Sequence, residues 1–156
     1  MAYGEPRFTQ DLDIVIRIHE GDIADFVTAI RDSFHHDEDD IREGVRRQGL
    51  FQLLDLDTMV KIDFHVGEAI PGELSRSREE TVLGGATIPL PTPEDTILSK
   101  LLWLKKGSFK SREDVIGILS IQKHLDFAYL SEMSRSLGVE DLFIEVRREA
   151  EEKAEH

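Results

Sequence analysis

Two aspartates separated by a single residue begin an otherwise apolar run, DLDIVIRI, at residues 11–18. The alternation of apolar residues predicts a strand, and residues two apart on a strand point to the same face. Asp11 and Asp13 would therefore present two carboxylates side by side. Carboxylates arranged in this way bind two hard cations about 3.5–4 Å apart, which is the arrangement of two-metal phosphoryl transfer.

A third aspartate, Asp63, lies inside a second apolar segment, MVKIDFHV, at residues 59–66. Alternation places Asp63 on the polar face of this strand, together with Lys61 and His65. If the two strands are neighbours, three carboxylates converge, and such a cluster repels itself strongly unless a cation is bound. The combination favours a site for Mg²⁺ or Mn²⁺, whereas the D-x-D pair alone is also typical of a solvated strand entrance.

The composition limits the classes of function. The chain has 156 residues and no cysteine, which suggests one domain without disulfides or thiolate metal sites. Its net charge of −13 argues against broad, charge-driven binding to nucleic acid or to anionic membranes. We find no apolar stretch of the roughly 20 residues needed to span a membrane, and no secretory signal. We therefore expect a cytoplasmic protein.

The coarse pattern predicts an α/β or α+β fold, in which a small sheet with flanking helices is followed by a helical bundle. Residues 1–91 would form the α/β core, and residues 92–156 a helical region packed on it as a single compact unit. A strand is expected over 51–57, turning near Asp57-Thr58 into the strand with Asp63. Residues 67–79 are expected to form a polar loop. Helices are predicted after Asp22, over 35–49, from Thr92 onward, and over about 111–124, 126–137 and 139–155.

Several motifs follow one another along the chain in a recognisable order. They are Arg7, Thr9, Asp11 and Asp13 in RFTQDLD, then Val60-Lys61-Ile62-Asp63, Pro93-Glu94-Asp95, Lys100-Leu101, and Arg112 with Asp114. Their order and spacing resemble the minimal nucleotidyltransferases of the DNA polymerase β-like superfamily. Within it, the chain is most similar to the group that includes the abortive-infection type IV toxins. The first motif is specific to this family, and the helical motifs are much less so. The resemblance implies a mixed, nucleotidyltransferase-like sheet.

The resemblance also implies roles for individual residues. Asp11, Asp13 and Asp63 would bind Mg²⁺ or Mn²⁺, and Asp63 would in addition activate an acceptor hydroxyl. The implied reaction transfers a nucleoside monophosphate from a nucleoside triphosphate to an acceptor in RNA, in protein or in a small molecule. Lys61 would help to neutralise the triphosphate, or simply pair with Asp63. The residues expected to contact the substrate are Arg7, Thr9, Lys61 and Lys100.

One departure from the family pattern supports a rival interpretation. The family has a glycine-rich turn upstream of the D-x-D strand, where backbone N–H groups cradle phosphates. Here Gly4 does not resemble that turn, and we expect a trimmed relative or a misplaced start. A trimmed relative would be an inactive binding or regulatory partner, for example in a toxin–antitoxin pair, with a partner protein or a second copy covering surface left by the missing helix. A metal-dependent phosphohydrolase is a third interpretation.

Other side chains leave alternatives open. The densest basic group of this acidic chain has two possible roles. It either guides an RNA or a nucleotide to the protein, or stabilises the C-terminal end of one helix by interacting with the helix dipole. Trp103, within an apolar L-L-W-L run, is expected in the core. Arg76 and Arg78, in the polar loop, either reach a phosphate or have no specific role. The basic group consists of Lys105, Lys106, Lys110 and Arg112.

Overall fold

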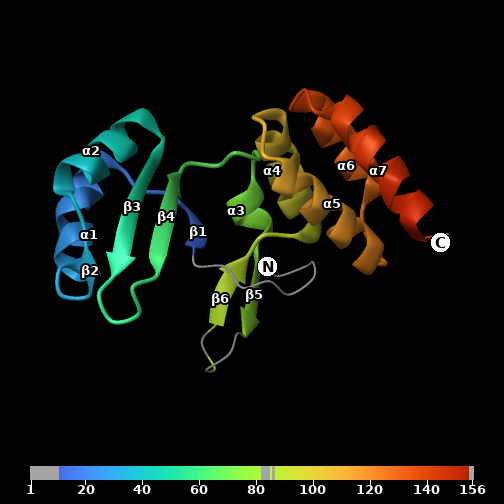
Figure 1. Ribbon diagram of the computed structural model, residues 1–156. Helices are drawn as coiled ribbons and strands as arrows, with labels where there is room; N and C mark the ends of the chain where they lie inside the picture. Colours follow the sequence, from blue (N-terminus) through green and yellow to red (C-terminus); the bar gives the residue numbers. More distant parts are fainter. Residues whose placement is uncertain (1–10, 82–84, 86, 155–156) are drawn as a thin grey trace. The chain divides into compact units, whose positions relative to one another are not determined.

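The computed structural model describes residues 11–81, 85 and 87–154 (Figure 1). The fold divides into two compact units at the junction of Ala69 and Ile70. We call the described residues before this junction the N-terminal unit, and those after it the C-terminal unit. Every helix among the described residues is too short or too polar to cross a membrane.

The N-terminal unit combines a sheet with two helices. In chain order, its elements are β1 (Asp11–Ile16), the 3₁₀ turn η1 (Glu20–Asp22), α1 (Ile23–Ile30), β2 (Phe34–His35), α2 (Glu38–Arg47), β3 (Leu50–Asp55) and β4 (Lys61–Val66). The four strands lie in the order β1-β4-β3-β2. β1 is parallel to β4, whereas β3 is antiparallel to both β4 and β2. The mixed sheet predicted from the sequence is confirmed.

One face of this sheet carries the apolar core of the N-terminal unit. The rings of Phe51 and Phe64 stack at 5.2 Å, and the ring of Phe26 on α1 meets both edge-on. The helices cover this face (Figure 1). Because strand side chains alternate between faces, the polar residues of β1, β3 and β4 are directed to the opposite face. The helix residues buried in this core are Ile23, Val27, Ile30, Ile41 and Val45.

The turns around the sheet use aspartate side chains. Asp37 begins α2 by accepting hydrogen bonds from the N–H groups of Asp39 and Asp40 at 2.8 and 3.3 Å. Asp55 accepts three hydrogen bonds in the turn to β4, and the bond from the Thr58 N–H makes the largest contribution to lowering the pKa of this carboxyl. Asp22 stands at the N-cap position of the helix predicted to follow it, but its side chain makes no capping hydrogen bond to α1 and accepts from the backbone N–H of His19 at 2.9 Å.

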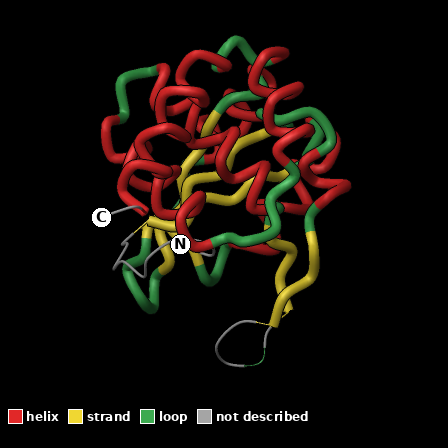
Figure 2. The backbone as a smooth tube through the Cα atoms, turned by 90° about the vertical axis from the view of Figure 1, so that its right-hand side faces the viewer, coloured by secondary structure: helices red, strands yellow, loops and turns green. Residues whose placement is uncertain are grey.

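The C-terminal unit is mainly helical. In chain order, its elements are α3 (Glu73–Arg76), β5 (Arg78–Thr81), β6 (Thr87–Leu90), α4 (Pro93–Lys105), α5 (Phe109–Ile121), α6 (Phe127–Ser136) and α7 (Glu140–Ala154). β5 and β6 form an antiparallel pair that extends from the helices (Figure 2). The segment predicted as a polar loop thus contains a short helix and the start of a strand.

Helix α4 begins as its sequence predicts and organises the helical core. The Thr92 hydroxyl accepts a hydrogen bond from the Asp95 N–H at 3.1 Å, and Pro93 occupies the first turn. The prediction that Trp103 is buried is wrong, because this side chain is 42% exposed. The buried stripe of α4 follows helical spacing, and Trp103 falls outside it. The residues of that stripe are Ile97, Leu98 and Leu101.

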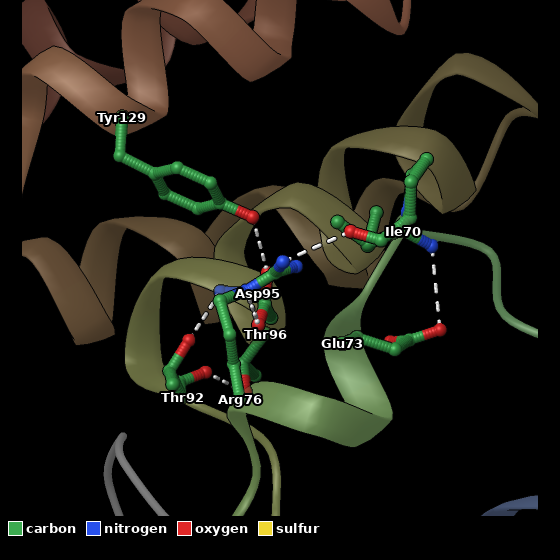
Figure 3. A network of polar contacts seen from close by, with 8 residues as sticks. Ile70, Glu73, Arg76, Thr92, Asp95, Thr96 and Tyr129 are labelled. Carbon is green, nitrogen blue, oxygen red and sulfur yellow. Dashed lines mark hydrogen bonds and ion pairs between the residues drawn. The ribbon is translucent and has the colours of Figure 1, made fainter.

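A buried carboxylate joins three segments of the C-terminal unit (Figure 3). The Asp95 side chain is 0% exposed and accepts two hydrogen bonds from the Arg76 guanidinium, at 3.0 and 2.8 Å. The Tyr129 hydroxyl donates a third bond to Asp95 at 2.7 Å, and the Arg76 guanidinium lies 5.1 Å from the Tyr129 ring centroid. Arg76 also donates to the Pro71 carbonyl at 2.9 Å. Arg76 therefore has a structural role in connecting α3, α4 and α6.

We expect the free energy of unfolding of Tyr129→Phe to decrease less steeply at high pH than that of the wild type. Burial raises the pKa of the Tyr129 phenol, and the hydrogen bond to Asp95 raises it further. The folded chain therefore keeps a proton that the unfolded chain loses near pH 10, so this stabilisation is complete below pH 10 and is lost as the pH rises. Urea unfolding between pH 8 and 11 should show a steeper loss for the wild type than for the variant. Equal slopes would contradict this prediction.

Candidate active site

The exposed face of the N-terminal sheet brings together two of the three predicted aspartates. Asp13 of β1 and Asp63 of β4 are partners in the parallel register. Their side chains therefore leave neighbouring strands, about 4.8 Å apart, on the same face. The exposed fractions are 66% for Asp13 and 18% for Asp63. The predicted cluster could form only if the two strands were neighbours, and in the structure β1 and β4 are paired.

Three predicted residues near the start of the chain lie wholly or partly outside the described residues. Asp11 begins β1, and its backbone is paired in register with Lys61. The Asp11 side chain, and all of Arg7 and Thr9, fall outside the part of the chain that the structure describes. Their predicted contacts with metal and substrate remain predictions.

Neighbouring side chains hold both described aspartates. Because an ionised carboxylate only accepts hydrogen bonds, His65 Nε2 donates to Asp13 Oδ1, at 3.1 Å. Gln52 Nε2 donates to Asp63 Oδ1 at 2.9 Å. The Lys61 ammonium lies 3.7 Å from that same oxygen. The two carboxylates are therefore oriented by polar neighbours on the sheet surface.

Gln52 is the site residue that the sequence predictions missed. It lies between the buried residues Phe51 and Leu53, so its alternation already placed it on the polar face of β3. What alternation could not show is the register, which sets Gln52 directly opposite Asp63. His65 was predicted beside Asp63, and it also reaches across to Asp13 on the neighbouring strand.

The described donor set partly fits a divalent cation. Carboxylate oxygens are the ligands that Mg²⁺ prefers, and Asp13 and Asp63 supply them from neighbouring strands. The side chains that the structure describes contain no cluster of three or more acidic, histidine or cysteine residues able to hold a metal ion. The predicted third ligand, Asp11, has its side chain outside that description.

The predicted contact residue Lys100 lies in the C-terminal unit, on α4. Its ammonium is 3.2 Å from Asp114 of α5, whose side chain is almost fully buried. Arg112, two residues before Asp114 on α5, donates to Glu149 and Glu145 of α7 at 2.9 and 2.6 Å. These hydrogen bonds raise the pKa of Arg112. The helical motifs therefore connect α4, α5 and α7, and a substrate contact by Lys100 stays a prediction.

Most of the basic group at the α4–α5 corner is engaged within the C-terminal unit. Lys105 donates to the Gly138 carbonyl at 3.1 Å, and the Lys106 ammonium lies 4.9 Å from the Trp103 ring centroid. Phe109, in the same corner, is 83% exposed. The position of Lys105 in the last turn of α4 agrees with stabilisation by the helix dipole.

The comparison with protein families gives a match that includes the strands carrying Asp13 and Asp63. Residues 1–115 match the family described as nucleotidyl transferase AbiEii toxin, type IV TA system. The chain belongs to the AbiEii family. The matched range contains every motif on which the resemblance rests, from Arg7 to Asp114. A search of curated proteins gave no match. The AbiEii family is a nucleotidyltransferase family of toxin–antitoxin systems, so the predicted resemblance is confirmed.

Proposed function

We propose that this AbiEii-family chain transfers a nucleoside monophosphate from a nucleoside triphosphate to an acceptor hydroxyl, with the help of a divalent cation. The observation that supports the proposal most directly is the pairing of Asp13 with Asp63 at one register of β1 and β4. Two carboxylates on neighbouring strands repel each other in the absence of a cation, so this placement suits a site that receives one. The nucleotidyltransferase family of the chain supports the same reaction.

The reaction exchanges a phosphoanhydride bond of the nucleoside triphosphate for a phosphoester bond to the acceptor. A bond forms between the acceptor oxygen and the α-phosphorus, and the bond from that phosphorus to the bridging oxygen breaks. Pyrophosphate leaves with the electron pair, and the hydroxyl proton passes to a base. Asp63 is our candidate for this base, because Gln52 holds its carboxylate in one orientation. Asp11, Asp13 and Asp63 would hold Mg²⁺ or Mn²⁺, which when bound neutralises phosphate charge and lowers the pKa of the acceptor hydroxyl.

The cationic side chains would guide the triphosphate. Lys61 places an ammonium beside Asp63, where it attracts phosphate as well as the carboxylate. Arg7, Thr9 and Lys100 complete the proposed substrate contacts. The toxin–antitoxin family suggests an antitoxin protein as a partner. The acceptor is RNA, protein or a small molecule, and the first assay should compare these three classes.

Removal of the divalent cation is expected to abolish transfer. The full chain is incubated with α-phosphate-labelled nucleoside triphosphates and MgCl₂, in separate reactions with total RNA, total protein and small hydroxyl compounds. We expect label on one acceptor class together with release of pyrophosphate, complete loss of both with excess EDTA, and recovery when Mg²⁺ is restored. MnCl₂ should also support the reaction.

The same assay distinguishes the rival interpretation of an inactive binding protein. A chain that binds nucleotide with Mg²⁺ in calorimetry, but labels no acceptor and releases no pyrophosphate, would be a regulatory partner with the nucleotidyltransferase fold. Absence of binding at millimolar nucleotide would refute the transferase proposal for this chain. Release of inorganic phosphate without transfer would instead indicate a phosphohydrolase.

A further inference from the structure

Polar side chains on β3 and β4 contact the aspartate pair of β1 and β4. Gln52 lies directly opposite Asp63 in the antiparallel β3–β4 register. His65 lies two residues beyond Asp63 on β4, and so reaches Asp13 diagonally across the parallel β1–β4 pair. Direct and diagonal cross-strand neighbours are within reach of long polar side chains. Among the described contacts, Asp63 accepts a hydrogen bond from Gln52 on β3, and Asp13 accepts one from His65 on β4.

The donor closest to Asp63, the Gln52 amide, differs from the donor expected of simple charge compensation. An aspartate that needs only a counter-charge is best served by Arg or Lys, whose hydrogen bonds carry a full positive charge. The amide of Gln52 brings no charge, yet it makes the closest described contact to Asp63, at 2.9 Å against 3.7 Å for Lys61. Both of these contacts use Oδ1 of Asp63, so the described side chains fix the direction in which Oδ2 points. A neutral donor orients a carboxylate and leaves its charge for a cation.

We propose that Gln52 and His65 are positioning residues, which hold Asp63 and Asp13 in the orientation that receives a divalent cation. This inference rests on the proposed metal site. Mg²⁺ demands near-ideal geometry, and a ligand that is already oriented loses less conformational freedom on binding. The hydrogen bond from His65 limits the rotation of the Asp13 carboxylate, whose side chain is 66% exposed. Removal of such supporting hydrogen bonds costs about 10–100-fold in metal affinity in other proteins.

The test measures Mn²⁺ affinity by calorimetric titration of the full chain. Gln52→Met and His65→Leu keep the side-chain bulk but remove the donor, and each should weaken Mn²⁺ binding about 10–100-fold. His65→Gln retains an N–H donor at a similar reach and should restore affinity to within about 3-fold of the wild type. His35→Leu is the matched control, since His35 is an exposed histidine on β2 of the same sheet, and it should bind like the wild type.

A structural role alone would not produce this pattern. If thermal unfolding shifts by no more than about 3 °C in each variant while affinity falls, the loss belongs to the site. Wild-type affinity in both Gln52→Met and His65→Leu, with binding lost in Asp63→Asn, would overturn the positioning role and leave the metal site standing. Absence of Mn²⁺ binding in the wild type, or unchanged binding in Asp63→Asn, would overturn the metal site and the positioning role together.

Discussion

Asp63→Asn is expected to lower nucleotidyl transfer by at least about 10³-fold while the fold stays intact. Asparagine has the same shape, and its amide oxygen still accepts the hydrogen bond that Gln52 donates. The substitution removes the negative charge of Asp63, which weakens cation binding. The transition-state stabilisation lost with the cation is worth several kcal/mol. Asp13→Asn should have an effect of similar size. Initial rates of pyrophosphate release at saturating Mg²⁺ and nucleotide measure the loss.

Asp32→Asn is the control for this experiment. Asp32 is an exposed aspartate between α1 and β2, and it has no place in the proposed site. Its replacement should leave the rate within about 2-fold of the wild type, because isolated surface substitutions have small effects. Far-ultraviolet circular dichroism of all three variants should match the wild type. A rate for Asp63→Asn within 10-fold of the wild type would remove Asp63 from the chemistry.

Arg76→Met is expected to destabilise the C-terminal unit by about 3 kcal/mol. The substitution leaves the Asp95 carboxylate, which is 0% exposed, with only the Tyr129 hydroxyl among its described side-chain partners (Figure 3). Breaking a buried pair by removing one partner typically costs about 3–5 kcal/mol, because the remaining charge is uncompensated. We expect the lower end of that range because the Arg76 side chain is itself 35% exposed. Urea unfolding followed by circular dichroism measures the change in the free energy of unfolding.

Two further variants test the cause of that loss. Arg78→Met removes an exposed arginine only two residues away, and should change the free energy of unfolding by no more than about 0.5 kcal/mol. Arg76→Met combined with Asp95→Leu removes both charges, and should recover part of the stability lost in the single variant. A loss below about 1 kcal/mol in Arg76→Met would mean that solvent screens the pair effectively.

Local patterns in the sequence predicted most of the elements around the candidate site. Alternation identified the strands that carry Asp13 and Asp63, and Thr92-Pro93 marked the start of α4. These signals depend on residues within one or two turns of each other, so they can be recognised without a tertiary structure. The boundary predicted at residues 91 and 92, and the packing of the two parts into one unit, depend on tertiary contacts that no local pattern specifies, and they stay predictions.

Contacts between distant residues could not be predicted in this way. The amide of Gln52 meets Asp63 only because of the β3–β4 register, which no local pattern specifies. Arg76 looked like one of many surface arginines, because its partners Asp95 and Tyr129 come from other elements. The burial of Trp103 was predicted wrongly, because an apolar neighbourhood in the sequence does not show which side of a helix is buried.

The strand order β1-β4-β3-β2 also determines when the site comes into being during folding. β3 and β4 pair across a short turn, whereas Asp13 and His65 are 52 residues apart in the chain. Contacts between residues close in sequence form at lower entropic cost than contacts that close a long loop. A partly folded molecule can therefore hold Asp63 and Gln52 in place before β1 has docked. If β1 detaches from the end of the described sheet, the carboxylate pair is lost while β2, β3 and β4 remain paired.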